Sequence, residues 1–376
     1  MFADAKRDYD LAVIGGGPAG AAAAWRAARH GLRTLLVERG ALPRDRVCGE
    51  FVSAEALPLL RRILAATRPD LIALSPLIAE LRLGGRRFRL PLPGRGIPRL
   101  ELDAALWEAA LAAGVEGRLR TEARRLQSGA GGYRLYLRAA GGESVITARA
   151  VIAAPGRWWR LEGLRGEAEN ARELPHACWV GVKAHLRRLA AEAVELYFFP
   201  GGYCGLAPVG RGMVNACCLA RRDTLKRPGA GLEASSDFPA WLAAAAREPG
   251  LERRLQGALQ AAPTVVTAPV RLGRARRRRG EVRLAGDAAG FIDPFTGEGI
   301  ARALFSGYAA AAECLPLEAL PWREALTLSQ RRPFLASGAL RLGSLLPAPL
   351  RDALLRLPGA AALVGLAFHG TRCHAA

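Results

Sequence analysis

Lysine is scarce in this chain and occurs only at positions 6, 183 and 226. The net charge of +20 over 376 residues is therefore carried almost entirely by arginine. Such a charge can attract an anionic partner, for example a membrane surface or a nucleic acid. Because alanine and leucine are also abundant, we interpret the arginine excess mainly as a compositional bias, with attraction to anions as a secondary consequence.

Paired metal ligands and long apolar runs are also missing. The seven cysteines include no C-x-x-C and the five histidines show no paired spacing, so we predict no metal site. The odd, scattered cysteines indicate no disulfide framework, which favours a reducing cytoplasm. We expect neither a signal peptide nor a membrane-spanning helix, because no run approaches roughly 18 apolar residues.

The first forty residues have the pattern of a βαβ unit. An apolar strand at 11–14 leads into the glycine turn GGGPAG. An alanine-rich helix follows as far as His30, and a second strand at 34–37 ends at Glu38. This order implies parallel strands joined by a right-handed crossover.

The turn has the Gly15-x-Gly17-x-x-Gly20 spacing of a dinucleotide site. Gly15 permits the tight turn, Gly17 lets a pyrophosphate approach the backbone, and Gly20 lets the helix pack close to the strand. The N-terminus of the helix attracts phosphate groups. Glu38 can accept hydrogen bonds from ribose hydroxyls, so the unit predicts a bound dinucleotide.

A second motif, GDAAGFIDPFTGEGI, favours FAD over NAD. A strand leads to Gly286 and Asp287, and the carboxylate of Asp287 can bind a ribityl chain or a ribose-facing hydroxyl. A helix then opens at Gly297, and its N–H groups can stabilise negative charge on a reduced flavin ring. A catalytic aspartate of a hydrolase is disfavoured, because no G-x-S-x-G accompanies it.

Together the two motifs resemble the FAD-dependent oxidoreductases of the aromatic hydroxylase superfamily, to which p-hydroxybenzoate hydroxylase belongs. The geranylgeranyl reductase-like branch is the most similar, and the resemblance extends to about residue 320. It implies an α/β fold in which a Rossmann-like FAD-binding domain is joined to an antiparallel-sheet substrate domain and a helical C-terminal tail. It also implies FAD as the cofactor, bound between the two domains.

RDRVCGEF resembles the segment of that branch that lies beside the flavin, and IPRLELDAAL resembles its arginine-plus-helix segment. The motifs and the resemblance together predict these cofactor contacts: Gly15, Gly17, Pro18, Ala19, Gly20, Glu38, Arg39, Arg46, Val47, Cys48, Arg99, Gly286, Asp287, Pro294, Gly297, Gly299 and Ile300.

Two residues of RVCGEF are our catalytic candidates. Cys48 has no partner ligands or disulfide partner, so we interpret it as a small polarisable wall near the reacting face. Glu50 is the only nearby group that could hand on a proton. We therefore predict that Cys48→Ser is milder than Glu50→Gln.

The chain departs from the family pattern in two places. Many members have A-D-G where this chain has A-P-G at 154–156, so NAD(P)H and other external electron donors both stay open. In YCGLAP, Tyr203 and Pro208 follow the branch, whereas Gly205 and Ala207 replace large aromatic residues. We place these four residues in the substrate pocket and expect the missing aromatics to enlarge or reshape it.

The domains are expected to be discontinuous. We assign 1–75, 97–160 and 270–330 to the FAD-binding domain, 76–96 and 161–269 to the substrate-binding sheet domain, and 331–376 to C-terminal helices.

We predict an oxidoreductase that acts on an apolar substrate, such as an isoprenoid, a quinone or a polyketide, by double-bond reduction with reduced flavin. A flavin monooxygenase acting through a C4a-hydroperoxide is the alternative reaction. A non-catalytic or RNA-interacting flavin-binding protein is the alternative of another class. Flavin halogenases share the fold, but their lysine and W-x-W-x-I-P signature have no match here.

Two surface features bear on partners. We interpret the basic run at 271–280 as a solvated turn, because it lacks interleaved aromatics, and we expect no nucleic-acid partner. The apolar C-terminal tail could cover the core or contact the inner face of a membrane. The sequence gives no indication of oligomeric state.

Overall fold

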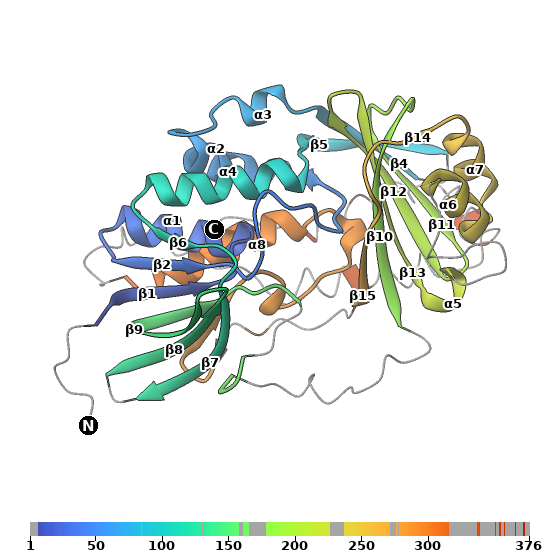
Figure 1. Cartoon of the computed structure of the whole chain (residues 1–376). Coiled ribbons are helices and arrows are strands. Elements are labelled where there is room, and N and C mark those ends of the chain that lie inside the picture. The colour runs from blue at the N-terminus through green and yellow to red at the C-terminus, as the bar shows by residue number, and fades with distance from the viewer. Residues whose placement is uncertain are drawn as a thin grey trace.

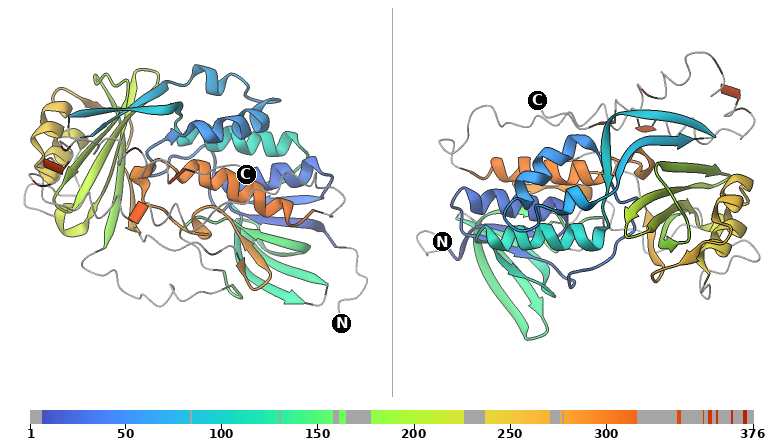
Figure 2. Two further views of the ribbon diagram at one scale, coloured as in Figure 1. Left: turned by 180° about the vertical axis from the view of Figure 1, so that it is seen from behind. Right: turned by 90° about the horizontal axis from the view of Figure 1, so that it is seen from above.

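The computed structural model describes residues 7–315 apart from 84, 130, 158–160, 165–177, 226–236, 271–275 and 277, together with a few residues nearer the C-terminus. Two β-sheets lie beside each other, and helices pack against each of them (Figure 1). Figure 2 shows the same two-part arrangement from behind and from above. The architecture is the mixed α/β fold that the sequence predicts.

The first sheet has a parallel centre and an antiparallel extension. Its strands are β1 (Tyr9–Ile14), β2 (Thr34–Val37), β6 (Glu116–Arg118), β7 (Glu122–Gly129), β8 (Gly132–Ala139), β9 (Gly142–Ala153), β16 (Arg278–Arg279) and β17 (Val282–Leu284). The order is β16-β17-β9-β1-β2-β6, and β7 and β8 extend β9 as an antiparallel meander. Neighbouring strands from β17 to β6 are parallel, so their carboxyl ends meet at one edge.

Three helices cover one face of this sheet: α1 (Pro18–Arg29), α4 (Arg99–Ala112) and α8 (Gly299–Ala312). Small residues let α1 and α8 pack closely. A Cβ on Gly307 would lie 1.9 Å from the carbonyl oxygen of Ala19, so only glycine allows this contact. Arg26 is fully buried there and donates a hydrogen bond to the carbonyl oxygen of Tyr308 at 3.0 Å. This packing fixes the N-termini of both helices at the same edge of the sheet.

The second sheet is mostly antiparallel. Its strands are β3 (Phe51–Val52), β4 (Leu77–Leu83), β5 (Arg86–Gly96), β10 (Trp179–Arg187), β11 (Val194–Phe199), β12 (Gly202–Gly210), β13 (Met213–Arg221), β14 (Leu259–Gln260) and β15 (Val265–Val270). The order is β14-β10-β13-β12-β11-β4-β5-β3, and β15 also pairs with β10.

The two faces of the second sheet have different roles. Side chains alternate between faces along a strand, so Val182 and Ala184 of β10 point away from their neighbours Lys183 and His185. Val182 and Ala184 pack in a core with two helices, α6 (Phe238–Ala246) and α7 (Pro249–Leu255). The opposite face is turned towards the loop that follows β2, because Lys183 contacts Asp45 and Glu50.

The remaining described elements are short: η1 (Ala54–Ala56), α2 (Leu57–Leu64), α3 (Leu71–Leu74), α5 (Arg222–Leu225), η3 (Gly286–Ala288) and η4 (Pro294–Thr296). Among the described helices, none is both long and apolar enough to cross a bilayer.

Some local expectations differ from the structure. The helical part of the segment 161–269, which we assigned to a sheet domain, forms the two helices α6 and α7, because Arg247 adopts a left-handed conformation just before Pro249. β3 lies within the segment 1–75, yet it pairs with β5 in the second sheet. The expected C-terminal helices at 331–376 fall almost wholly outside the described residues, and the assignment of domains stays a prediction.

Candidate active site

The glycine turn after β1 forms an open cradle. Gly15 has a φ of +102°, and a Cβ there would lie 2.3 Å from the carbonyl oxygen of Ala154, so the tight turn requires glycine. A Cβ on Gly20 would lie 1.8 Å from the carbonyl oxygen of Gly15. A Cβ on Gly17, in contrast, would meet nothing within 4 Å. Gly17 therefore presents bare backbone to open space, as the approach of a pyrophosphate requires.

Glu38 lies at the end of β2, beside this cradle. Its Oε2 accepts a hydrogen bond from the Gly16 N–H at 3.0 Å. Its Oε1 accepts from the Gly40 N–H at 2.9 Å and from Arg44 Nη2 at 2.7 Å. Burial raises the pKa of Glu38, but these N–H groups and the Arg44 guanidinium outweigh it, and the net pKa is lowered. Oε2 keeps capacity for one more donor, such as a ribose hydroxyl.

Two arginines of the flavin half face the same space. Burial, together with the charge of Arg44, lowers the pKa of Arg46 to about 10, which marks a site that favours an added anion. Arg99, the first residue of α4, is held by Asp103 through two hydrogen bonds of 2.7 and 2.8 Å. A pyrophosphate close to Arg46 would relieve the repulsion between the guanidinium groups.

The second motif occupies the neighbouring strand end. Gly286 follows β17, and its N–H donates to Ser306 Oγ of α8 at 2.8 Å. Burial raises the pKa of Asp287, while Arg157, with Nε 3.6 Å from Asp287 Oδ2, opposes the shift. Gly297 adopts φ +74° and directs the chain into α8. The N-terminus of α8 therefore faces the same space as the glycine turn of α1.

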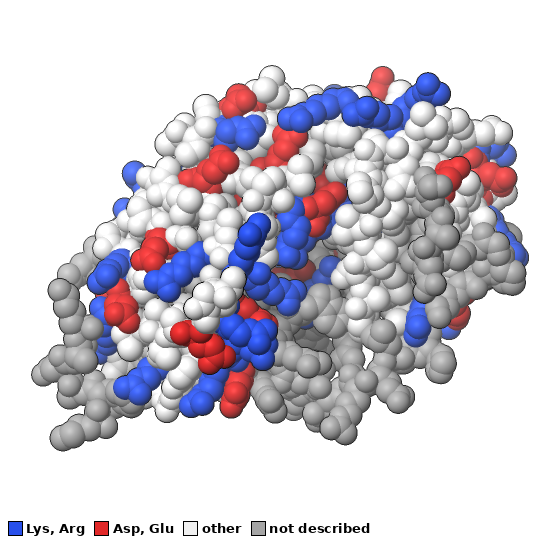
Figure 3. Space-filling model, in the orientation of Figure 1, with Lys and Arg blue, Asp and Glu red and all other residues white. Residues whose placement is uncertain are grey.

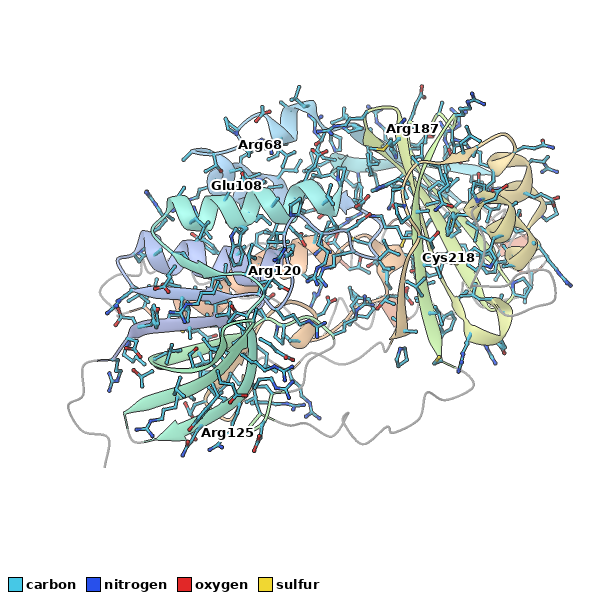
Figure 4. The ribbon with its side chains drawn as sticks, in the orientation of Figure 1. Arg68, Glu108, Arg120, Arg125, Arg187 and Cys218 are labelled. Carbon is cyan, nitrogen blue, oxygen red and sulfur yellow. The ribbon has the colours of Figure 1, made fainter. Side chains whose placement is uncertain are left out.

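A cavity of about 380 Å³ joins these parts to the second sheet. Its lining includes every predicted cofactor contact except Gly15 and Gly20, which shape the turn from behind. The far end is apolar and includes Leu81, Leu90, Leu196, Val266 and Phe295. Figure 4 shows side chains of both halves meeting between α8 and the second sheet, where Cys218 marks β13 and Arg187 marks the end of β10.

The structure separates the four predicted substrate residues. Tyr203, Gly205 and Ala207 alternate along β12 and line the cavity, whereas Pro208 is on the other face and is absent from the lining. Tyr203 donates a hydrogen bond to Asp293 Oδ1 at 3.3 Å. A Cβ on Gly205 would lie 3.3 Å from Leu196, so a large side chain there would displace the wall. Leu196 therefore fills part of the space that an aromatic side chain at position 205 would occupy.

Glu50 lies in a buried ionic network that sequence reasoning missed. Its Oε1 is 2.5 Å from Lys183 Nζ and accepts the Arg99 backbone N–H at 2.6 Å. Its Oε2 is 2.6 Å from His185 Nε2. Asp45, from the same loop as Glu50, lies 2.5 Å from Lys183 Nζ. The signal that could have revealed this network is the alternation of a lysine and a histidine within an otherwise apolar strand.

The loop that carries these carboxylates is held tightly on the sheet. Glu50 has a φ of +58°, an uncommon conformation for a residue other than glycine that is typical of functional sites. Asn215 of β13 donates a hydrogen bond to the Cys48 carbonyl oxygen at 2.8 Å. Cys48 itself lines the cavity, and its Sγ accepts the Glu50 N–H at 3.4 Å. The catalytic roles of Cys48 and Glu50 stay predictions.

The geometry fits FAD. Cβ atoms added at Gly17, Gly49 and Gly299 would each meet nothing within 4 Å, and all three residues line the cavity. The cradle thus offers bare backbone at three points along one continuous space. Glu38 at one end, Arg46 in the middle and Asp287 beside α8 supply polar groups for ribose, pyrophosphate and ribityl parts. A two-part α/β protein with such a cradle belongs to the class of FAD-dependent oxidoreductases.

Comparison with known proteins gives the family. The signature of the pyridine nucleotide-disulphide oxidoreductases matches residues 9–206. Digeranylgeranylglycerophospholipid reductase 2 of Methanopyrus kandleri is 30% identical over 323 residues, which are 82% of this chain and 78% of that protein. Menaquinone reductase of Mycolicibacterium smegmatis is 28% identical over 324 residues, 80% of this chain and 75% of the relative. This chain belongs to the pyridine nucleotide-disulphide oxidoreductase family and is related to the digeranylgeranylglycerophospholipid reductases.

Solved structures show the same fold. A geranylgeranyl bacteriochlorophyll reductase-like protein from Thermoplasma acidophilum superposes with a TM-score of 0.70 at 21% identity, covering 96% of both chains. A flavin-dependent brominase superposes with a TM-score of 0.71 at 17% identity, covering 97% of this chain and 94% of the brominase. The prediction of an FAD-dependent oxidoreductase is confirmed.

Proposed function

We propose that this protein uses reduced FAD to reduce a double bond or quinone ring of an isoprenoid substrate. The observation that carries the proposal is the continuity of the cavity, whose polar cofactor end opens directly onto an apolar wall of the second sheet. A long apolar chain can bury its surface against that wall, at about 25 cal/mol per Å² of contact. The relatives named for a digeranylgeranyl lipid and for menaquinone support this substrate class.

The residues of this chain have separate tasks in such a reaction. FAD, when bound and reduced, supplies the hydride. Gly17 and Arg46 hold the pyrophosphate, and Glu38 holds a ribose. The N–H groups that begin α8 stabilise negative charge in the bound cofactor. The apolar wall excludes water and aligns the substrate, which leaves the supply of one proton to polar groups of the loop 45–50.

A direct test is anaerobic mixing of the reduced, FAD-loaded protein with menaquinone or a geranylgeranyl lipid. We expect the flavin absorbance of the oxidised form to return within one turnover as the substrate is reduced. Reoxidation by oxygen alone, with no response to either substrate, would contradict the proposal and favour the monooxygenase alternative. If the purified protein binds no FAD, the proposal is contradicted before any substrate is tested.

We also propose that the protein contacts the inner face of a membrane, where such substrates reside. Three exposed leucines make up what we call the leucine patch: Leu74 at the end of α3, Leu77 at the start of β4 and Leu100 in the first turn of α4, which are 77%, 53% and 41% exposed. Arg95 lies opposite Leu77 in the β4–β5 pairing. Arg211 projects nearby, because its Nη2 is 3.1 Å from Oε1 of Glu101. Apolar side chains beside arginines fit an anionic lipid surface.

The charge distribution on this side supports the proposal. Figure 3 shows basic side chains along the upper edge of the molecule, above the region of β5 and the ends of the second sheet. The apolar tail that suggested membrane contact from the sequence lies almost wholly outside the described residues. The leucine patch therefore carries the proposal.

Vesicle flotation with the FAD-loaded protein tests this contact. We expect co-flotation with vesicles that contain phosphatidylglycerol, weaker binding to pure phosphatidylcholine, and loss of binding in a Leu74→Ser/Leu77→Ser variant. Leu259→Ser is the matched control, because Leu259 is 48% exposed on β14 and outside the patch. Equal flotation of all three proteins would exclude the leucine patch as the contact.

A further inference from the structure

Four ionisable side chains join the flavin half to the second sheet, and we call them the interdomain cluster: Asp45, Glu50, Lys183 and His185. Lys183 Nζ bridges Asp45 Oδ1 and Glu50 Oε1, both at 2.5 Å. His185 Nε2 lies 2.6 Å from Glu50 Oε2, and its Nδ1 lies 3.8 Å from Asp45 Oδ2. Lys183 and Glu50 are fully buried, whereas the side chain of Asp45 is 21% exposed.

With both carboxylates ionised, the formal charges of the cluster balance when His185 is protonated. Asp45 and Glu50 contribute two negative charges, and Lys183 contributes one positive charge. Burial lowers the pKa of Lys183, but Glu50 and Asp45 outweigh it and raise the pKa, so the ammonium persists. A net charge in a buried site is costly, and an imidazolium at His185 removes it. Nε2 is within hydrogen-bond distance of Glu50 Oε2, and Nδ1 lies 3.8 Å from Asp45 Oδ2, so the ring stands between two carboxylates.

The nearest charged groups on the surrounding elements have acidic partners of their own: Arg157, whose charge reaches Cys217, lies 3.6 Å from Asp287. The guanidinium of Arg99 on α4 is paired with Asp103, and only its backbone N–H reaches Glu50. On β13, Asn215 lies opposite His185 and is uncharged. Cys217 lies opposite Lys183, and burial raises the pKa of its thiol to about 12, so it stays neutral. On β15, Val265 lies opposite Lys183 and is apolar.

We propose that His185 stores the proton of the reductase reaction and that Asp45 passes it to the cavity. This inference rests on the proposed function, in which reduction adds a hydride to one substrate atom and a proton to the other. Nδ1 of His185 lies 3.8 Å from Oδ2 of Asp45, so the two atoms must first approach to hydrogen-bond distance; the proton then passes to Asp45, which lines the cavity, and from there towards the substrate. The neutral ring is then reprotonated from solvent through the partly exposed Asp45.

Glu50 has a different task in this arrangement from the one the sequence suggested. Glu50 borders the cavity, but its side chain has no exposed surface and its oxygens are engaged with Lys183, Arg99 and His185. It is a positioning residue that holds the imidazole through Nε2, as the buried carboxylate of a hydrolase triad orients its histidine. Lys183 compensates the charge of the two carboxylates.

The charge state is tested by NMR of ¹⁵N-histidine-labelled, FAD-loaded protein, with His185→Gln assigning the signal. Near neutral pH we expect both ring nitrogens of His185 to have imidazolium shifts. Asp45→Asn and Glu50→Gln each remove one negative charge, so each should leave the ring neutral. Glu195→Gln, which alters a buried carboxylate of β11 outside the cluster, should leave it protonated. A neutral ring in the wild-type protein, or a protonated ring in both cluster variants, would overturn the inference.

The role in proton supply is tested by single-turnover oxidation of the reduced protein with menaquinone. We expect His185→Gln to slow this step by about 10²-fold, the typical contribution of a positioned acid, and to remove its dependence on pH. FAD content should match the wild type. A wild-type rate with an unchanged pH profile would overturn the proposal. If the wild-type protein fails with menaquinone and with geranylgeranyl lipids, the proposed function fails, while NMR still decides the charge state.

Discussion

At the scale of single residues, the residue types of the candidate site say less about its chemistry than the hydrogen bonds that their polar atoms make. Glu38 was predictable from its place after the second strand, but its bonds to Gly16, Gly40 and Arg44 were not. Those bonds fix both oxygens and leave one acceptor position on Oε2. The carboxylate is thus prepared for a ribose before the cofactor binds.

Glu38→Gln should weaken both folding and FAD binding. The amide NH₂ would face donors that now bond to a carboxylate, and charge-assisted hydrogen bonds contribute about 1.5–3 kcal/mol. We expect a roughly tenfold or larger increase in the FAD dissociation constant, measured by flavin fluorescence titration. Glu116→Gln is the control, because Glu116 is a half-exposed carboxylate on the neighbouring strand β6.

The same substitution has a predicted pH signature. The folded-state pKa of Glu38 lies below its ordinary value of 4.5. The stability that this shift contributes is therefore fully present above about pH 4.5 and is lost as the pH falls through the folded value. In urea unfolding of the flavin-free protein, the wild type should exceed Glu38→Gln by a constant amount near neutral pH. A difference that grew on acidification would contradict this assignment.

At the scale of elements, the βαβ unit was largely predictable because local chemistry determines it. The strand 11–14, the glycine turn and the helix to His30 correspond to β1 and α1 within a few residues. The interdomain cluster was not predictable, because its members come from a loop and a strand far apart in the sequence. Only pairing of β10 with β13 and the approach of the loop 45–50 bring Lys183 to Glu50.

Gly17, the N-cap of α1, and Gly20, within α1, should respond differently to substitution by alanine. Gly17→Ala places a methyl group in the open cradle, so the fold should persist within about 0.5 kcal/mol while FAD binding is lost. Gly20→Ala places its Cβ 1.8 Å from the Gly15 carbonyl oxygen, so the packing of helix on strand must fail. Thermal unfolding of the two flavin-free proteins and the flavin content of the same proteins as purified check this. A stable, yellow Gly17→Ala protein would contradict the cradle.

At the scale of the whole molecule, the second sheet does more than enclose the substrate. One face packs on α6 and α7, and the other presents Lys183, His185 and Asn215 to the flavin loop. The family resemblance implied a second domain built on an antiparallel sheet. It could not indicate which face would meet the cofactor, because that depends on the register between β10 and β13, which β11 and β12 separate in the sequence.

The central claim is that the flavin delivers reducing equivalents to an isoprenoid substrate, and the mass of the product tests it most directly. Reduced, FAD-loaded protein is incubated with a geranylgeranyl lipid or menaquinone, with and without oxygen, and the product is analysed by mass spectrometry. We predict a gain of two hydrogen atoms without oxygen. A product that forms only with oxygen and gains an oxygen atom would contradict the claim.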